Sequence, residues 1–145
     1  MNNYNDNFNL DRFIKAQKTA YPFCIQELKN GKKRTHWMWF IFPQLKELGS
    51  SYTSKYYGIS SLDEARAFLN NSLLRNRYFE CLEILLNSEN NNINDILGEV
   101  DAKKLKSSIT LFMQIDNNKI YNDLLNKYYN GNMCIRTLEI INKNN

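Results

Sequence analysis

Basic residues and the chain's single histidine crowd into the segment KKRTHWMWFIFPQ, residues 32–44. Lys33 and Arg34 stand directly before Thr35, a residue type that commonly caps helices. Unpaired amides at the start of a helix attract anions, and adjacent basic side chains strengthen that attraction. His36 would follow in the first turn, where its imidazole could serve as general acid or base. The segment therefore predicts an anion site at a helix start, with His36 as the candidate catalytic residue.

Aromatic and amide groups in the same segment add a second kind of contact. Trp37 and Trp39 could stack on a base, a sugar or another planar group, and Gln44 could both donate and accept hydrogen bonds. The run HWMWFIF is also apolar on every side, as expected of a helix at the centre of a core, with Pro43 ending it. Each residue alone has that structural interpretation. Their concentration within a dozen positions favours a ligand site.

A second polar cluster lies in DAKKLKSSITLF, residues 101–112. On a helix, Asp101, Lys104 and Ser108 fall on one face, with Ser107 beside them. Such a face could hold a phosphate through Lys104 and the serines. It could equally be a solvated face that begins with Asp101 as the helix cap. A ligand site built from both segments requires that they meet in space.

The cysteine and histidine content limits metal chemistry. Cys24, Cys81 and Cys134 are far apart in the sequence, and structural zinc sites need four ligands that usually include a close pair. We predict neither a metal site nor a cofactor. Cys24 and Cys81 lie on apolar helical stripes and are expected to be small buried hydrophobes. The odd number of cysteines argues against a secreted disulfide scaffold.

Length and composition favour one globular domain. The chain has 145 residues, of which 43% are hydrophobic and 13% aromatic, which suffices for a single core. The net charge is +4, but Lys and Arg are spread along the chain, which argues against a nucleic-acid-binding protein. No run approaches the ~18 apolar residues that span a bilayer, and the start MNNYNDNFN lacks a signal-peptide core. We therefore expect no membrane association and a cytoplasmic location.

The spacing of apolar residues predicts helices and no alternating strand pattern. Asn9, Ser61 and Asp101 are expected helix caps, Ser61 as part of a capping box with Glu64. Pro22 is expected to break the first helical stretch near Tyr21. We predict an all-α fold, a compact single-domain bundle of about six to eight short helices. The domain would cover residues 9–142, after a flexible tail at residues 1–8.

The stretches RTHWMWFIFPQL, YYGISSLDEARAFL, LKSSITLF and NGNMCIRTLEII resemble the bacterial domain-of-unknown-function family 1810. Some of its members have been labelled calpastatin-like. The resemblance extends from about Phe8 to Ile141 and implies a mainly helical bacterial protein without an assigned activity. The chain departs from the family pattern at Thr35, where Ser is common, and around Met133 and Cys134, where Asp or Pro is common. The matching positions include Gln17, Lys33, His36, Trp37, Trp39, Pro43, Gln44, Asp101, Lys104, Ser108, Thr110 and Phe112.

Two functions from different classes are compatible with these features. One is a binding pocket for a nucleotide or another phosphate-bearing ligand. The sequence shows no nucleophile–base arrangement, so it does not decide whether the chain is also an enzyme. The alternative is a protein-interaction adaptor without catalytic activity. A concave, partly open aromatic cluster that meets Lys104 would favour the ligand, and a flat exposed apolar patch a protein partner. The candidate ligand-binding residues are Lys33, Arg34, His36, Trp37, Trp39, Gln44, Asp101, Lys104 and Ser108.

Overall fold

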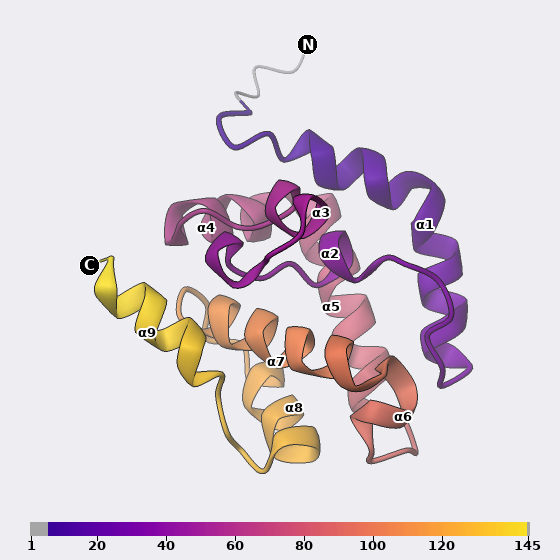
Figure 1. The fold of residues 1–145 in the computed structure, drawn as a ribbon. Coiled ribbons are helices and arrows are strands. Elements are labelled where there is room, and N and C mark those ends of the chain that lie inside the picture. The colour runs from indigo at the N-terminus through magenta and orange to yellow at the C-terminus, as the bar shows by residue number, and fades with distance from the viewer. Residues whose placement is uncertain (1–5, 145) are drawn as a thin grey trace.

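The computed structural model describes residues 6–144, and every regular element within them is a helix, apart from a single bridge between Leu45 and Ile59 (Figure 1). The elements are α1 (Asp11–Lys29), α2 (Met38–Ile41), the 3-10 turn η1 (Lys46–Leu48), α3 (Tyr52–Tyr56), α4 (Leu62–Asn70), α5 (Ser72–Leu86), α6 (Ile93–Leu97), α7 (Glu99–Met113), α8 (Ile120–Tyr129) and α9 (Ile135–Lys143). The predicted all-α class is confirmed. Residues 1–5 of the predicted tail lie outside the described residues.

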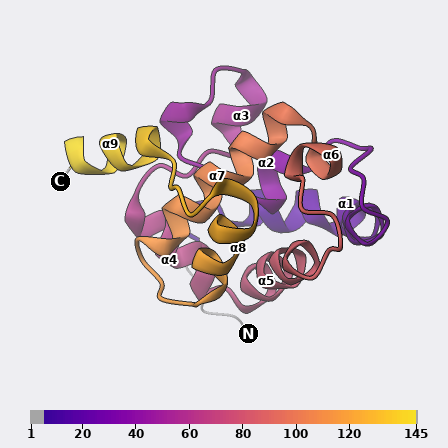
Figure 2. The same cartoon turned by 90° about the horizontal axis from the view of Figure 1, so that it is seen from below.

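Two long helices organise the bundle. α5 contacts α1, α4 and α8, whereas α7 contacts α4, α6, α8 and α9 and crosses the middle of the molecule in Figure 2. The rings of Tyr78 on α5 and Phe112 on α7 lie 4.8 Å apart, and both side chains are buried. The Tyr78 hydroxyl also lies 2.9 Å from that of Ser108 on α7. No helix in the described part of the chain is both long and apolar enough to cross a bilayer.

α1 is one continuous helix of 19 residues, so the predicted break at Pro22 is wrong. Pro22 is exposed, and the residues after it continue the buried face with Cys24 and Leu28. Packing of that face offsets the loss of one backbone donor. The predicted cap at Asn9 is also wrong. The Asp6 carboxylate instead accepts hydrogen bonds from the amides of residues 10 and 11, at 2.5 and 3.0 Å.

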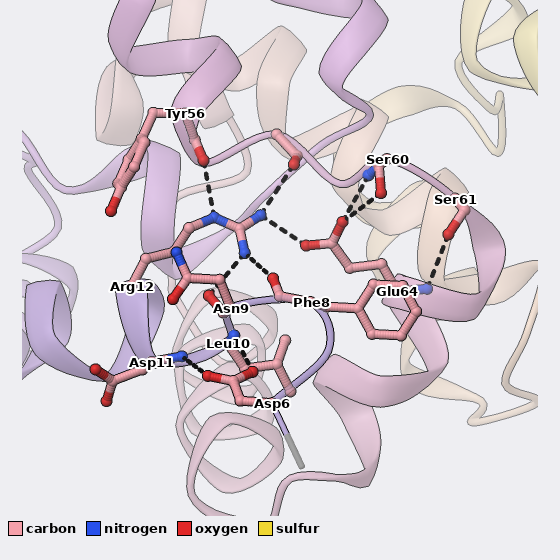
Figure 3. Close-up of polar contacts among 11 residues, drawn as sticks. Asp6, Phe8, Asn9, Leu10, Asp11, Arg12, Tyr56, Ser60, Ser61 and Glu64 are labelled. Carbon is pink, nitrogen blue, oxygen red and sulfur yellow. Dashed lines mark hydrogen bonds and ion pairs between the residues drawn. The ribbon is translucent and has the colours of Figure 1, made fainter.

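A buried ion pair joins α1 to α4 (Figure 3). The Arg12 guanidinium lies 2.6 Å from the Glu64 carboxylate, with side chains 7% and 3% exposed. The other Glu64 oxygen accepts hydrogen bonds from the Ser60 amide and hydroxyl at 2.8 and 2.7 Å. The cap at Ser61 is confirmed, since its hydroxyl accepts from the Glu64 amide, but the Glu64 carboxylate does not complete the capping box. Arg12 also donates to the backbone carbonyls of Phe8, Asn9, Tyr56 and Gly58.

Gly58 is required by a close backbone approach beside this ion pair. A Cβ atom at this position would lie 2.4 Å from the Cα of Lys46. The contact belongs to the bridge in which Lys46 donates to the Ile59 carbonyl at 2.8 Å and Ile59 donates to the Gln44 carbonyl at 2.9 Å. We expect Gly58→Ala to lower the free energy of unfolding by about 1–3 kcal/mol, because the two segments must separate. Urea denaturation would measure this loss; a variant as stable as the parent would contradict the close approach.

Candidate ligand-binding surface

The segment after α1 is folded around one buried carboxylate. Glu27, 7% exposed, accepts hydrogen bonds from the amides of Arg34 (2.7 Å) and Thr35 (3.0 Å). It also accepts from the Thr35 hydroxyl at 2.6 Å and from the Trp37 indole N–H at 2.9 Å. The predicted helix cap at Thr35 is therefore wrong. α2 begins only at Met38, because the hydroxyl and amides of the preceding loop are held by Glu27.

The negative charge on Glu27 contradicts the prediction that this loop binds an external anion. Burial alone would raise the pKa of the Glu27 carboxyl, but the hydrogen bonds from Thr35, Arg34 and Trp37 outweigh burial and lower that pKa to about 2. The carboxylate therefore carries its charge at neutral pH. The amides expected to bind an external anion are occupied by an anion of the protein itself. The amides of Arg34 and Thr35 therefore do not form the anion site that was predicted at a helix start.

Trp37 lies in the core rather than at a surface. Its side chain is fully buried and its ring packs 6.1 Å from that of Phe42. Met38, Phe40 and Ile41 are buried with it, so the core interpretation of this aromatic run holds for most of its members. Trp37 has no free ring face for a ligand.

Trp39 and His36 differ from Trp37 in exposure. Trp39 is partly buried and His36 is exposed, and their rings lie 6.2 Å apart. His36 precedes α2, so its predicted position in the first turn of a helix is wrong. The Trp39 ring nevertheless lies beside Lys104 of the second polar cluster, and His36 lies next to Trp39.

The two polar segments meet in space. Lys33 lies 2.9 Å from one carboxylate oxygen of Asp101, and Lys104 lies 3.9 Å from the other. The Lys104 ammonium is also 5.7 Å from the centroid of the Trp39 ring. The Lys33 amide donates to the Ile96 carbonyl at 2.7 Å, which fixes this loop beside the start of α7. Asp101 is not the predicted cap, because α7 begins at Glu99, and its side chain serves instead as the link between the segments.

Of the two further predicted site residues, Ser108 lies apart from this surface, whereas Gln44 lies beside it. Ser108 is fully buried and its hydroxyl pairs with Tyr78, so the prediction that it faces a ligand is wrong. Gln44 lines a cavity of about 10 Å³ together with Trp39 and Lys104. That volume suits roughly one water molecule. The predicted segment thus forms an open basic and aromatic surface over a very small cavity.

A much larger cavity lies elsewhere among the described residues and was not predicted. It measures about 870 Å³ and opens between η1, α4 and α9. Leu45, Ile59 and Ile140 form its apolar floor, and Lys46 and Lys55 stand among the charged residues at its rim. Sequence spacing gave no signal for it, because the lining residues are brought together only by the tertiary fold. No group of three or more possible metal ligands is found within residues 6–144.

Comparisons with known proteins give a family but no activity. The model of a family described as "Protein of unknown function (DUF1810)" matches residues 7–141. A solved structure, the conserved hypothetical protein Rv1873 from Mycobacterium tuberculosis, is 44% identical, with a TM-score of 0.91 over 93% of this chain and 97% of that one. Among curated proteins, none matches the chain.

Proposed function

We propose that this chain, which belongs to the DUF1810 family of proteins of unknown function, binds a small phosphate-bearing ligand with a planar ring, such as a nucleotide. The binding face would be the basic–aromatic surface, formed by Arg34, His36, Trp39 and Lys104. The observation that carries the proposal is the position of Lys104, whose ammonium lies 5.7 Å from the Trp39 ring centroid although the two residues come from different helices. A planar ring stacked beside Trp39 would place its phosphate near that ammonium.

The charge balance at this surface favours an anion. Asp101 holds Lys33 closely at 2.9 Å but Lys104 only at 3.9 Å, so Lys104 retains capacity for another partner. Within residues 6–144, Lys32 and Arg34 have no ion-pair partner, and both side chains are exposed. The buried Glu27 carboxylate is already satisfied by four hydrogen bonds. Lys104, together with Lys32 and Arg34 of the adjoining loop, is therefore a cation that could pair with a phosphate.

The groups on this surface are better suited to binding a ligand than to catalysing a reaction. They supply ammonium and guanidinium donors, one indole face and one imidazole, and they lack a cavity that would exclude water. Any reaction would use His36 as general acid or base. We also propose a cytoplasmic location, since Cys24, Cys81 and Cys134 are free thiols.

Calorimetric titration with AMP, adenosine and inorganic phosphate tests the proposal. We expect AMP to bind more tightly than either fragment, because only AMP carries both ring and phosphate. Lys104→Ala and His36→Ala should each weaken AMP binding, Lys104→Ala by about tenfold or more. Lys103→Ala is the matched control, since it removes the same charge from an exposed position of the same helix, and it is Lys104 that contacts Trp39. Equal affinities for the parent chain, Lys104→Ala and Lys103→Ala, or no binding of AMP, would contradict the proposal.

A protein-interaction adaptor is the second candidate, and one observation favours it. Tyr52 and Tyr56 are 83% and 45% exposed, and their rings stack 6.2 Å apart at an interplanar angle of 16°. Exposed tyrosines of this kind are enriched at protein interfaces. A Tyr52→Ser/Tyr56→Ser variant separates the two functions, because it would remove this patch and leave AMP binding unchanged.

A further inference from the structure

Cys134 differs from the other two cysteines in its surroundings. Cys24 and Cys81 are fully buried, with sulfur atoms 3.8 Å apart. Cys134 is partly exposed and is the N-cap residue of α9, a helix of nine residues. Amides at a helix start stabilise negative charge, and a thiolate at such a position is more reactive than a buried thiol.

Two hydroxyl groups of α7 hold Cys134 in place. The Ser107 hydroxyl shares its proton between the Lys103 carbonyl at 3.1 Å and the Cys134 sulfur at 3.3 Å. The Cys134 amide donates to the Thr110 hydroxyl at 2.9 Å, and Thr110 in turn donates to the Lys106 carbonyl at 2.8 Å. Ser107 and Thr110 are both buried, so this arrangement is built into the packing of α9 on α7. The backbone of Cys134 is therefore fixed while its sulfur keeps partial access to solvent.

The hydroxyl of Thr137 supplies an independent observation. It is fully buried, and it is the one buried side-chain oxygen or nitrogen within residues 6–144 without a hydrogen-bond partner of regular geometry. Thr137 lies in the first turn of α9, three residues after the capping Cys134. Burial alone would raise the pKa of the Cys134 thiol, but the hydroxyls of Ser107 and Thr137 and the amides of Thr137 and Arg136 outweigh burial and lower it. A thiolate would give the Thr137 hydroxyl the acceptor that it otherwise lacks.

We propose that Cys134 is a nucleophilic modification site that forms mixed disulfides with low-molecular-weight disulfides. The thiol first gives its proton to solvent. The Cys134 thiolate then attacks one sulfur of the small disulfide, so that a new sulfur–sulfur bond forms and the old one breaks. The second half of the small disulfide leaves as a thiolate with the electron pair of the broken bond. The site is separate from the basic–aromatic surface and does not depend on the proposed ligand.

Charged side chains of both helices lie within a few residues of Cys134 or of the hydroxyls that contact it. On α7 they are Lys103 and Lys106, and the Lys106 ammonium lies 5.8 Å from the Tyr129 ring centroid. On α9, Arg136 pairs with Glu139 at 3.8 Å. The Ser107 hydroxyl and the start of α9 are the groups that would stabilise a thiolate at Cys134.

The test is the reaction of the folded full-length chain with oxidised glutathione near neutral pH, followed by peptide mass analysis. We expect one glutathione per chain, on Cys134, with Cys24 and Cys81 unmodified until the chain is unfolded. The rate of alkylation by iodoacetamide, measured against pH, then reports the thiol pKa. Thr137→Val should raise that pKa and slow alkylation at neutral pH about threefold to tenfold. Thr137→Ser keeps a hydroxyl and should retain the parent rate.

Thr19→Val on the exposed face of α1 is the matched control, and thermal unfolding would check that each variant is folded. Ser107→Ala offers a second variant that removes a hydroxyl from the neighbouring helix, with the same expected direction. Modification of Cys134 only in unfolded chains would overturn the proposal. So would alkylation profiles that coincide for the parent, Thr137→Val and Ser107→Ala.

Discussion

Glu64→Ala is expected to lower the free energy of unfolding by about 3–5 kcal/mol, because it leaves the buried Arg12 guanidinium without its counter-charge. The two side chains are 7% and 3% exposed and lie 2.6 Å apart. The substitution also removes the acceptor for the Ser60 amide and hydroxyl. Urea denaturation followed by circular dichroism would measure the loss. Asp63→Ala on the same helix is the control, since its carboxylate is exposed and pairs with the exposed Arg66.

The double variant Arg12→Met/Glu64→Leu distinguishes the cost of an unpaired buried charge from the cost of lost hydrogen bonds. It removes both charges but leaves the carbonyls of Phe8, Tyr56 and Gly58 without the donors they have in the parent. We therefore expect partial recovery of stability relative to Glu64→Ala. A Glu64→Ala variant within about 1 kcal/mol of the parent would contradict the role assigned to this ion pair.

Glu27→Gln is the second substitution with a large expected effect, a loss of about 3 kcal/mol at neutral pH. The pKa of the Glu27 carboxyl falls from 4.5 to about 2 in the folded chain. Each pKa unit corresponds to about 1.4 kcal/mol. Because the folded-state pKa is the lower one, the stabilisation is fully present above about pH 4.5. It is lost as the pH falls through about 2, below which the carboxyl is protonated in both states.

Denaturation curves of parent and Glu27→Gln between about pH 2 and pH 7 test this expectation. The difference in unfolding free energy should be largest at neutral pH and should shrink as the pH falls through the window below about 4.5. Glu83→Gln on α5 is the control, since Glu83 is exposed. A difference that is independent of pH would show that the Glu27 charge does not account for the loss.

Local periodicity predicted much of the fold. The apolar helical stripe predicted to carry Cys81 corresponds to α5, where Cys81 is buried, and the Ser61 cap was found because it depends only on neighbouring residues. The prediction of a helix break at Pro22 failed because the outcome depends on residues that are distant in sequence. Its intrinsic cost is offset by packing of Cys24 and the rest of the α1 face against helices that are distant in sequence. That packing cannot be inferred from local spacing.

For the site, too, local features could be predicted and tertiary contacts could not. The residue types Lys33, Trp39 and Lys104 were identified from the sequence, but their meeting depends on tertiary packing of the loop on α6 and α7. Ser108 was assigned to the polar face, although it also shares helical spacing with the buried Leu105. Helical spacing of this kind could also have identified Glu27 as a buried carboxylate.

Glu27 was overlooked because a glutamate within a helix is usually solvated. It lies three residues after Cys24 and directly before Leu28, both buried. Its place on the apolar stripe is the signal that would have marked it as a buried, hydrogen-bonded carboxylate. Its four donors, all within residues 34–37, explain why no helix begins at Thr35.

The most direct test of the proposed ligand surface is an NMR titration of the ¹⁵N-labelled chain with AMP, observed at the two indole N–H groups. Trp37 serves as an internal reference, since its ring is buried and its N–H is held by Glu27. We predict that the Trp39 indole signal moves with added AMP, together with the His36 ring signals, while the Trp37 signal stays in place. An unmoved Trp39 signal, or AMP-dependent shifts confined to the cavity between η1, α4 and α9, would contradict the account.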